Sequence, residues 1–317
     1  MPQTPTVLEI VRRRDRIDRI DDRKLRAAIE RGEWVRVVPG AFVRREDWHR
    51  LTAMDRHRLR VDEASRRMLP GSVISHAAAA AHWRMDILGD WPTVIDTSCG
   101  PARGGRSSGL IRRHPRRLED LELTVIGEHF VTSPAQTALD LARTLTFSRG
   151  VSVVDQAIWT ERAGGALTSK DAIMRLLGAG PAHRGDARAL RAISFAEPLA
   201  ANVRESQSRV VIAQLGFPKP RLQERRRLRS GRLVFGDFYW PEHDHWGELD
   251  GRGKYLSPDF GADRASHEIV IDEKRREDEI RREVRGFSRW EPTDVDAPRR
   301  LFDILRGDGL PSALRRP

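Results

Sequence analysis

Three carboxylates stand close together in the stretch GRLVFGDFYWPEHDHWGELDGRGKY of an otherwise basic chain. Asp237 lies in an apolar run, and Glu248 and Asp250 lie in a second run after a short turn. If the first run is a β-strand, alternation puts Asp237 on the same face as Phe235 and Tyr239. A charge in an apolar row is costly unless something compensates it. The pattern therefore predicts a partner for Asp237.

A divalent cation would be such a partner. Asp237 and Glu248 on adjacent strands, with the carbonyl of the residue before Asp250, form half of the oxygen shell that Mg²⁺ or Mn²⁺ prefers. A bound ion lowers the pKa of its water and neutralises charge on phosphate oxygens, so the pattern indicates phosphodiester hydrolysis. The alternative is that Asp237 and Asp250 are turn and strand-end residues paired with arginines. His243 and His245 are expected in a solvent-exposed turn rather than in a metal site.

The elements that position these carboxylates are predicted to be a helix, three strands, a second helix and a last strand. An apolar side that includes Val203 and Val210 predicts a helix ending at Gly216, with Glu205 in its first turns. Strands are then expected over residues 222–228 and 233–239, and from Trp246 onward. The later helix and strand fall within IDEKRREDEIRREVRGFSRWEPTDV.

This order, with Asp on one strand and Glu-x-Asp-Gly on the next, is similar to the PD-(D/E)XK nuclease superfamily, in particular to the small branch related to very-short-patch-repair endonucleases. The similarity extends over residues 196–309. It implies that Asp237 and Glu248 bind the metal and that Glu205 is the acidic residue of the first helix. It also implies that basic residues of the closing segment face the site.

One position departs from the superfamily. The usual lysine, two residues after the glutamate, is Asp250 here. Lysine is valued at that point because its ammonium group orients the attacking water and stabilises the developing charge. Lys254, after a glycine-flanked turn, and Lys274, on the following helix, are candidates for the same space. Many relatives share the Glu-x-Asp-Gly form, so we retain Asp250 and Lys254 among the candidate catalytic residues.

Residues 1–60 show two helical patterns followed by a small hairpin. Val7, Ile10 and Val11 recur at helical spacing, and LRAAI does so again before a glycine. The β-prone runs EWVRVV and AFVRR, divided by Pro-Gly, predict the hairpin. This is the order of a winged helix-turn-helix, whose second helix enters the major groove and whose wing contacts the backbone. The alternative is a helical cap with a solvated basic face. The candidate DNA contacts are Arg23, Lys24, Arg26, Arg31 and Arg36.

Residues 61–145 predict a mixed α/β middle domain. A helix is expected to begin near Ser75, whose hydroxyl can cap it, and TSPAQTALDLART predicts a second capped helix. WPTVIDTSC, GLIRRH and LELTVIG are β-prone. His76 and His82 do not share a helical face, so neither is assigned to a metal. Residues 146–195 predict a helical linker.

The patterns RGEWVRVVPGAFV, ISHAAAAAHW and VTSPAQTALDLA resemble the actinobacterial proteins that carry an AbiEi-type antitoxin N-terminal domain from type IV toxin–antitoxin systems. The resemblance covers residues 5–160. It implies a winged helix that binds promoter DNA and usually represses its own operon, and it implies a cognate toxin as a second partner.

Composition indicates the class of partner and the compartment of the protein. The formal net charge is +11 and the sequence pI is about 10.8, which favours a polyanionic partner, with nucleic acid before an anionic membrane. The alternative source of the charge is the arginine and alanine usage of a high-GC genome. The single cysteine, Cys99, excludes an internal disulfide and a Cys-based zinc cluster. The sequence shows no signal peptide or membrane span, so we expect a cytoplasmic protein without a membrane partner.

These observations predict an α/β (α+β) protein with four parts: a winged helix-turn-helix, a mixed α/β middle domain, a helical linker, and over residues 196–317 a restriction-endonuclease-like α/β domain. Two functions compete. One is a Mg²⁺- or Mn²⁺-dependent DNA endonuclease targeted by its winged helix. The other is a non-catalytic antitoxin or transcriptional regulator that uses the nuclease fold for binding.

Overall fold

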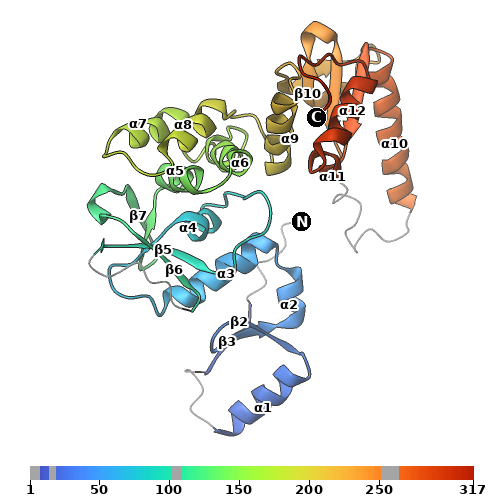
Figure 1. The fold of residues 1–317 in the computed structure, drawn as a ribbon. Helices are drawn as coiled ribbons and strands as arrows, with labels where there is room; N and C mark the ends of the chain where they lie inside the picture. The colour runs from blue at the N-terminus through green and yellow to red at the C-terminus, as the bar shows by residue number, and fades with distance from the viewer. Residues whose placement is uncertain (1–7, 14–18, 102–108, 251–263) are drawn as a thin grey trace. The chain divides into compact units, whose positions relative to one another are not determined.

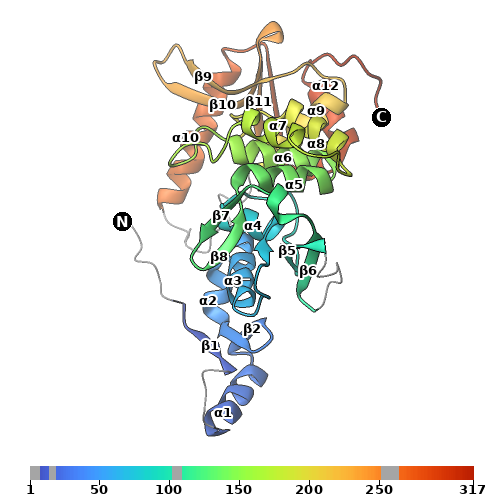
Figure 2. The ribbon, with the colours of Figure 1, turned by 90° about the vertical axis from the view of Figure 1, so that its left-hand side faces the viewer.

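The computed structural model describes residues 8–13, 19–101, 109–250 and 264–317, and its secondary structure is mixed α/β with three sheets (Figures 1 and 2). The fold class expected from the sequence is therefore confirmed. The chain divides into two compact units, residues 1–145 with 167–190 and residues 146–166 with 191–317. No helix in the described part of the chain is long and apolar enough to cross a membrane.

The first unit begins with a three-stranded sheet and one helix. The sheet has the order β1-β3-β2, and helix α1 packs its apolar side, which includes Leu25 and Ala28, against Trp34 and Phe42. The elements are β1 (Ile10–Arg12), α1 (Arg19–Glu30), β2 (Trp34–Val38) and β3 (Ala41–Arg44). The turn between β2 and β3 passes through Gly40, whose φ of +78° is a conformation that glycine adopts readily.

The first of the two predicted N-terminal helices is wrong. Ile10 and Val11 lie in β1, which pairs antiparallel with β3 through Ile10↔Val43 and Val11↔Phe42, while Val7 lies outside the described residues. An apolar run this short does not distinguish a helix from a strand, and pairing with β3 decides the outcome. The predicted second helix and the hairpin are confirmed as α1 and β2–β3.

A five-stranded sheet of order β6-β5-β4-β8-β7 forms the rest of the first unit's framework. Its strands are β4 (Val73–Ile74), β5 (Ile95–Cys99), β6 (Ile111–Pro115), β7 (Leu123–Ile126) and β8 (His129–Thr132). The β-prone segments named from the sequence are thus confirmed. Helices α2 (Arg45–Arg50), α3 (Ala53–Ser65), α4 (His76–His82) and α5 (Pro134–Thr144) accompany it, with a short 3-10 helix at Leu118–Asp120.

The two caps predicted in this region differ in outcome. Ser133 caps α5 as expected, because its hydroxyl accepts a hydrogen bond from the backbone N–H of Gln136. Ser75 precedes α4, but its hydroxyl makes no cap bond to that helix. It bonds instead to Ser98 on β5 and to the His76 ring, each at 3.0 Å.

The helices between residues 146 and 195 belong to both units. Helix α6 (Phe147–Ile158) packs against α9 in the second unit, whereas α7 (Lys170–Gly178) packs against α5 in the first. Helix α8 covers Asp186–Phe195. The segment is helical as predicted, and its helices contribute to the packing of the two units.

The second unit contains a four-stranded sheet of order β12-β11-β10-β9, in which β11 and β12 are parallel and the other neighbours antiparallel. Its strands are β9 (Arg221–Arg227), β10 (Leu233–Trp240), β11 (His245–Leu249) and β12 (Gly286–Trp290). Its helices are α9 (Val203–Gln214), α10 (Arg264–Arg281), α11 (Pro292–Val295) and α12 (Pro298–Gly307), with a 3-10 turn at Pro241–His243. Figure 1 shows α9 and α10 on opposite sides of the sheet.

Each face of this sheet has its own core. Phe238, Trp240 and Trp290 pack on the side of α9 and α12, together with residues such as Ile212 and Leu301. Tyr239, Trp246 and Phe287 pack with Ile280 of α10 on the other side. The sheet is therefore a buried central layer that can hold side chains of neighbouring strands in fixed positions.

Candidate functional site

Asp237 on β10 and Glu248 on β11 lie next to each other across the sheet. The ladder between the two strands runs from Trp240↔His245 to Phe238↔Gly247, and Asp237 and Glu248 are the next residue of each strand beyond that last pair. The Asp237 carboxylate accepts a hydrogen bond of 3.0 Å from the backbone N–H of Leu249. Asp237 therefore contacts β11 between the two acidic residues of the Glu-x-Asp motif, and the structure brings together the two predicted metal ligands.

The side-chain alternation expected for β10 is broken beside Asp237. Val234 and Tyr239 pack in the same cluster on the α10 side, although an unbroken strand would place them on opposite faces. Opposite Asp237, Gln223 of β9 has a φ of +50°. A glycine is needed at 236 because a Cβ there would lie 2.3 Å from the Trp246 ring. The single apolar face predicted for this strand is therefore wrong, and Asp237 stands at the irregularity.

Glu248 is buried in an ion pair with Arg276 of α10. Its carboxylate oxygens accept hydrogen bonds of 2.8 and 3.4 Å from the Arg276 guanidinium and a third, of 3.0 Å, from the indole N–H of Trp246. Burial by itself lowers the pKa of Arg276, but the neighbouring Glu248 and Glu273 carboxylates outweigh it, so that the pKa is raised. Arg276 is thus held as a cation beside Glu248.

Asp250 pairs with Arg289 of β12 at 3.4 Å. Arg289 also lies 2.5 Å from Glu277 and 3.9 Å from Glu273, both on α10. Burial lowers the pKa of Arg289, and the Asp250 and Glu277 carboxylates raise it by more. Asp250 therefore belongs to a charge network that joins the ends of β11 and β12 to α10.

Glu205 lies at the start of α9, where it has a local role. It is buried, and it accepts hydrogen bonds from the backbone N–H of Ala201 and the side-chain amide of Asn202, which caps the helix. A third bond, of 3.2 Å, comes from the Gln223 amide on β9, at the position opposite Asp237. Glu205 thus connects the helix start to the irregular part of the sheet.

The two candidate lysines have different positions. Lys254 lies outside the described residues, and Lys274 is exposed on α10. Among the described residues, the cations that contact the acidic motif are Arg276 and Arg289, neither of which was predicted individually from the sequence. Both lie in segments rich in arginine, so sequence alone gave no signal that distinguished them from their neighbours. Within the described ranges, no group of three or more His, Cys, Asp or Glu side chains is arranged to hold a metal ion.

His245 corrects another expectation. It was predicted in a solvent-exposed turn, but it begins β11, is 2% exposed and hydrogen-bonds to the Ser288 hydroxyl of β12 at 2.8 Å. Burial lowers its pKa. His243 lies in the preceding 3-10 turn and is half-buried.

The predicted DNA contacts lie on α1 and the hairpin of the first unit. Arg23, Lys24 and Arg26 are exposed on α1, opposite its apolar side, and Arg31 and Arg36 are exposed after it. Arg26 pairs with Asp22 at 2.8 Å and Arg31 with Glu33 at 2.6 Å.

A cavity of about 430 Å³ brings some of these cations together. Arg26 of α1 and Arg36 of β2 line it with Arg13, a residue that the sequence analysis missed. Arg13 is held there by a backbone hydrogen bond to Gly40 and by an ion pair with Asp22 at 3.3 Å. Three guanidinium groups at one hollow can contact phosphate oxygens.

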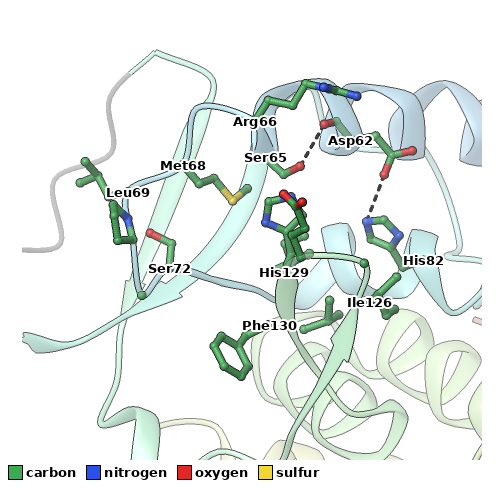
Figure 3. A pocket seen from close by; sticks show the side chains of 16 residues that line it. Asp62, Ser65, Arg66, Met68, Leu69, Ser72, His82, Ile126, His129 and Phe130 are labelled. Atoms are coloured by element: carbon green, nitrogen blue, oxygen red, sulfur yellow. Dashed lines mark hydrogen bonds and ion pairs between the residues drawn. The ribbon is translucent and has the colours of Figure 1, made fainter.

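A second cavity, of about 730 Å³, opens between α3, the β7–β8 hairpin and the loop before β4 (Figure 3). His82 of α4 and Asp62 of α3 form its polar wall, with 3.5 Å between the imidazole and the carboxylate. Burial raises the pKa of Asp62 and lowers that of His82.

The first unit also holds a buried polar network centred on Asp96 of β5. The Asp96 carboxylate accepts hydrogen bonds from Arg112 and, at 2.7 Å, bonds to His114, both on β6. Burial raises the pKa of Asp96, but these two partners outweigh it and hold the pKa at about 2. The His76 ring stacks on His114 with 3.8 Å between centroids, and burial lowers the pKa of His76 to about 4.

Comparisons with known proteins show only partial sequence similarity and a distant structural similarity. No family model matches the chain. Two uncharacterized proteins of Mycobacterium tuberculosis, MT2308 of strain CDC 1551 / Oshkosh and Rv2248 of strain ATCC 25618 / H37Rv, are each 28% identical to it over 117 residues. The match spans 37% of this chain and 41% of each relative's length. The crystal structure of the RV2827C protein from the same organism is 17% identical with a TM-score of 0.34, covering 63% of this chain and 74% of that one.

Proposed function

We propose that this protein binds DNA and hydrolyses its phosphodiester backbone with a divalent cation. The observation that carries the proposal is the pair of carboxylates on adjacent strands, Asp237 and Glu248, with Asp237 bonded to the backbone of β11. The order α9, β9, β10, β11, α10, β12 supports it, because this is the order expected from the resemblance to PD-(D/E)XK nucleases. The left-handed backbone of Gln223, opposite Asp237, supports it further, since residues held in such conformations cluster at active sites.

The donor set fits Mg²⁺ or Mn²⁺. Carboxylate oxygens are the ligands that these hard cations prefer, and Mg²⁺ commonly uses one or two protein carboxylates and completes its shell with water and substrate phosphate. Asp237 and Glu248 would hold the ion. When bound, the ion lowers the pKa of a water molecule and neutralises charge on the phosphate. This chemistry does not need a third protein carboxylate.

The other residues of the site have supporting roles in this proposal. Glu205 fixes the start of α9 and, through Gln223, the strand that lies opposite Asp237. Asp250 holds Arg289 at the end of β12. Lys254 is proposed as the ammonium group that stabilises the transition state, because it follows the motif along the chain.

DNA recognition is assigned to the first unit. The cations of α1 and the hollow lined by Arg13, Arg26 and Arg36 would contact the phosphate backbone. The net charge of +11 supports a nucleic-acid partner. We place the protein in the cytoplasm, where such DNA is accessible and where the buried Cys99 would stay reduced.

The second candidate is a non-catalytic antitoxin or transcriptional regulator that uses the nuclease fold only for binding, with a cognate toxin as partner. The ion pair between Glu248 and Arg276 favours it, because a carboxylate held by a guanidinium and an indole N–H resembles a structural salt bridge. The AbiEi-like N-terminal pattern supports the same alternative.

A cleavage assay separates the two. Linear, nicked and mismatched DNA are incubated with the full chain in Mg²⁺ or Mn²⁺, with Asp237→Ala as the matched variant. The endonuclease proposal expects metal-dependent products from the wild type and none from the variant. DNA binding without cleavage of any substrate in either metal would favour the regulator.

A further inference from the structure

Arg276 is bound to the carboxylate of Glu248, which the proposed function assigns to the metal. Its guanidinium hydrogen-bonds both oxygens of Glu248, and the two side chains are only 18% and 10% exposed. The Trp246 indole adds a third hydrogen bond to Glu248 at 3.0 Å. Three of the roughly four lone-pair sites of this carboxylate are therefore in use. A divalent cation that binds both oxygens must take one that Arg276 now uses, and any cation at Glu248 meets the guanidinium's positive charge at close range.

Arg276 has other partners to which it can turn. It donates a hydrogen bond of 3.0 Å to Glu273, one turn earlier on α10, and one of 2.8 Å to the backbone carbonyl of Phe235. A guanidinium has five N–H donors, so Arg276 can release Glu248 and remain held by Glu273. The displaced group would then lie beside Asp237 and Glu248 with donors unused.

We propose that Arg276 competes with the divalent cation for Glu248 and, once displaced, binds a phosphate group of the DNA strand. This inference rests on the proposed function, because it needs the metal and the substrate of that site. Without metal, Arg276 neutralises Glu248 and is shielded from DNA. With metal, the guanidinium gains a planar, bidentate anionic partner in the phosphate.

Arg289, the other cation at the motif, is less suited to this role. Its guanidinium lies within 4.0 Å of three carboxylates, those of Asp250, Glu273 and Glu277. If Glu248 bound a metal ion, these three carboxylates would still hold Arg289. Arg276 is therefore the cation whose charge becomes available when a metal binds.

Isothermal titration with Mn²⁺ alone tests the competition in the full-length protein. The variants are Arg276→Gln and Arg276→Lys, and the matched control is Arg275→Gln, an exposed neighbour on the same helix. Arg276→Gln should bind Mn²⁺ about tenfold more tightly than the wild type, the scale of one charge-assisted hydrogen bond. The Mn²⁺ affinity of Arg276→Lys should lie between those of the wild type and Arg276→Gln, because lysine keeps the charge but loses the bidentate geometry. Arg275→Gln should match the wild type.

The second arm measures binding to a duplex protected from cleavage by phosphorothioate linkages. Without metal, Arg276→Gln should bind as the wild type does. With Mn²⁺ the variant should bind the duplex several-fold more weakly. The slope of log affinity against log salt concentration should fall by about one, the amount expected for one lost phosphate contact. Melting in EDTA checks that each variant folds, and the Arg276→Lys comparison decides the matter if Arg276→Gln does not fold.

The outcomes separate this inference from the proposed function. Equal Mn²⁺ affinity of the wild type and both Arg276 variants, with DNA cleavage by the wild type intact, would overturn only the competition. Weaker Mn²⁺ binding by Arg276→Gln would also overturn it, because Arg276 would then support the metal site. Absence of Mn²⁺ binding in every variant, together with absence of cleavage, would overturn both.

Discussion

The side chain of Asp237 on β10 accepts a 3.0 Å hydrogen bond from the backbone N–H of Leu249 on β11. The bond fixes one carboxylate beside Leu249, the residue that follows Glu248 on β11. Asparagine can accept the same bond through its carbonyl oxygen but carries no charge for a cation. Asp237→Asn therefore separates the position of this side chain from its charge.

Asp237→Asn should keep the fold and lose the response to metal. A ligand that binds only the folded state stabilises it by RT ln(1 + [L]/Kd), about 2.7 kcal/mol at a hundredfold excess over Kd. Millimolar Mn²⁺ should raise the melting temperature of the wild type and leave that of the variant unchanged. Identical shifts in the two proteins would place the metal elsewhere.

Charge reversal on α1 should weaken DNA binding. Arg23, Lys24 and Arg26 are exposed on one helix, so changing all of them to Glu should lower affinity and flatten its dependence on salt, since fewer counterions are released. The control changes three exposed arginines of the α7–α8 region to Glu, namely Arg175, Arg184 and Arg191. An equal loss of affinity in both triple variants would show a general effect of net charge.

Stability of the first unit should fall below pH 6.5. His57 of α3 and His76 of α4 are buried, and burial lowers the pKa of each to about 4. The unfolded chain therefore binds protons between pH 6.5 and 4 that the folded chain does not. Each histidine can cost roughly 3 kcal/mol across that window, and the loss is complete near pH 4. Asp96, whose pKa is lowered to about 2, adds a further loss as the pH falls from about 4 to 2.

Urea unfolding at a series of pH values measures this effect. His57→Phe removes one of the two titrating groups and should reduce the slope of unfolding free energy against pH between pH 6.5 and 4. If the variant kept the wild-type slope, folding would not lower the pKa of His57, and His57 would be protonated in the folded state over this pH range.

The two lysines should differ in their contribution to turnover. Lys274 is exposed on α10, and Lys274→Ala should change the cleavage rate little. Lys254→Ala should reduce it by about two orders of magnitude, the scale for one transition-state donor, while DNA affinity stays within a few-fold. The reverse ranking in single-turnover rates would move the role to α10.

Much of the C-terminal architecture could be predicted because its signals are local. Turn residues and apolar runs gave strands at 222–228 and 233–239, and the structure has them at Arg221–Arg227 and Leu233–Trp240. The N-terminal run with Ile10 and Val11 could not be predicted in this way, because pairing with β3, a contact distant in sequence, decides its conformation.

The partners of the acidic motif could not be predicted in the same way. Arg276 meets Glu248 only because α10 covers one face of the sheet, and a rotation of the helix by about 100°, one residue, would present Arg275 instead. His245 is buried by the parallel pairing of β11 with β12, which the sequence around its turn does not indicate. The candidate carboxylates came from the sequence, and their electrostatic surroundings came from the tertiary structure.

The most direct measurement is the single-turnover cleavage rate of DNA in Mn²⁺ by the wild type and by Asp237→Asn, at protein concentrations that saturate binding of both. We predict metal-dependent cleavage by the wild type, abolished by EDTA, and a rate at least about a hundredfold lower for Asp237→Asn. Equal rates would contradict a catalytic role for the carboxylate pair, and DNA bound at saturation but left intact by the wild type would contradict the nuclease itself.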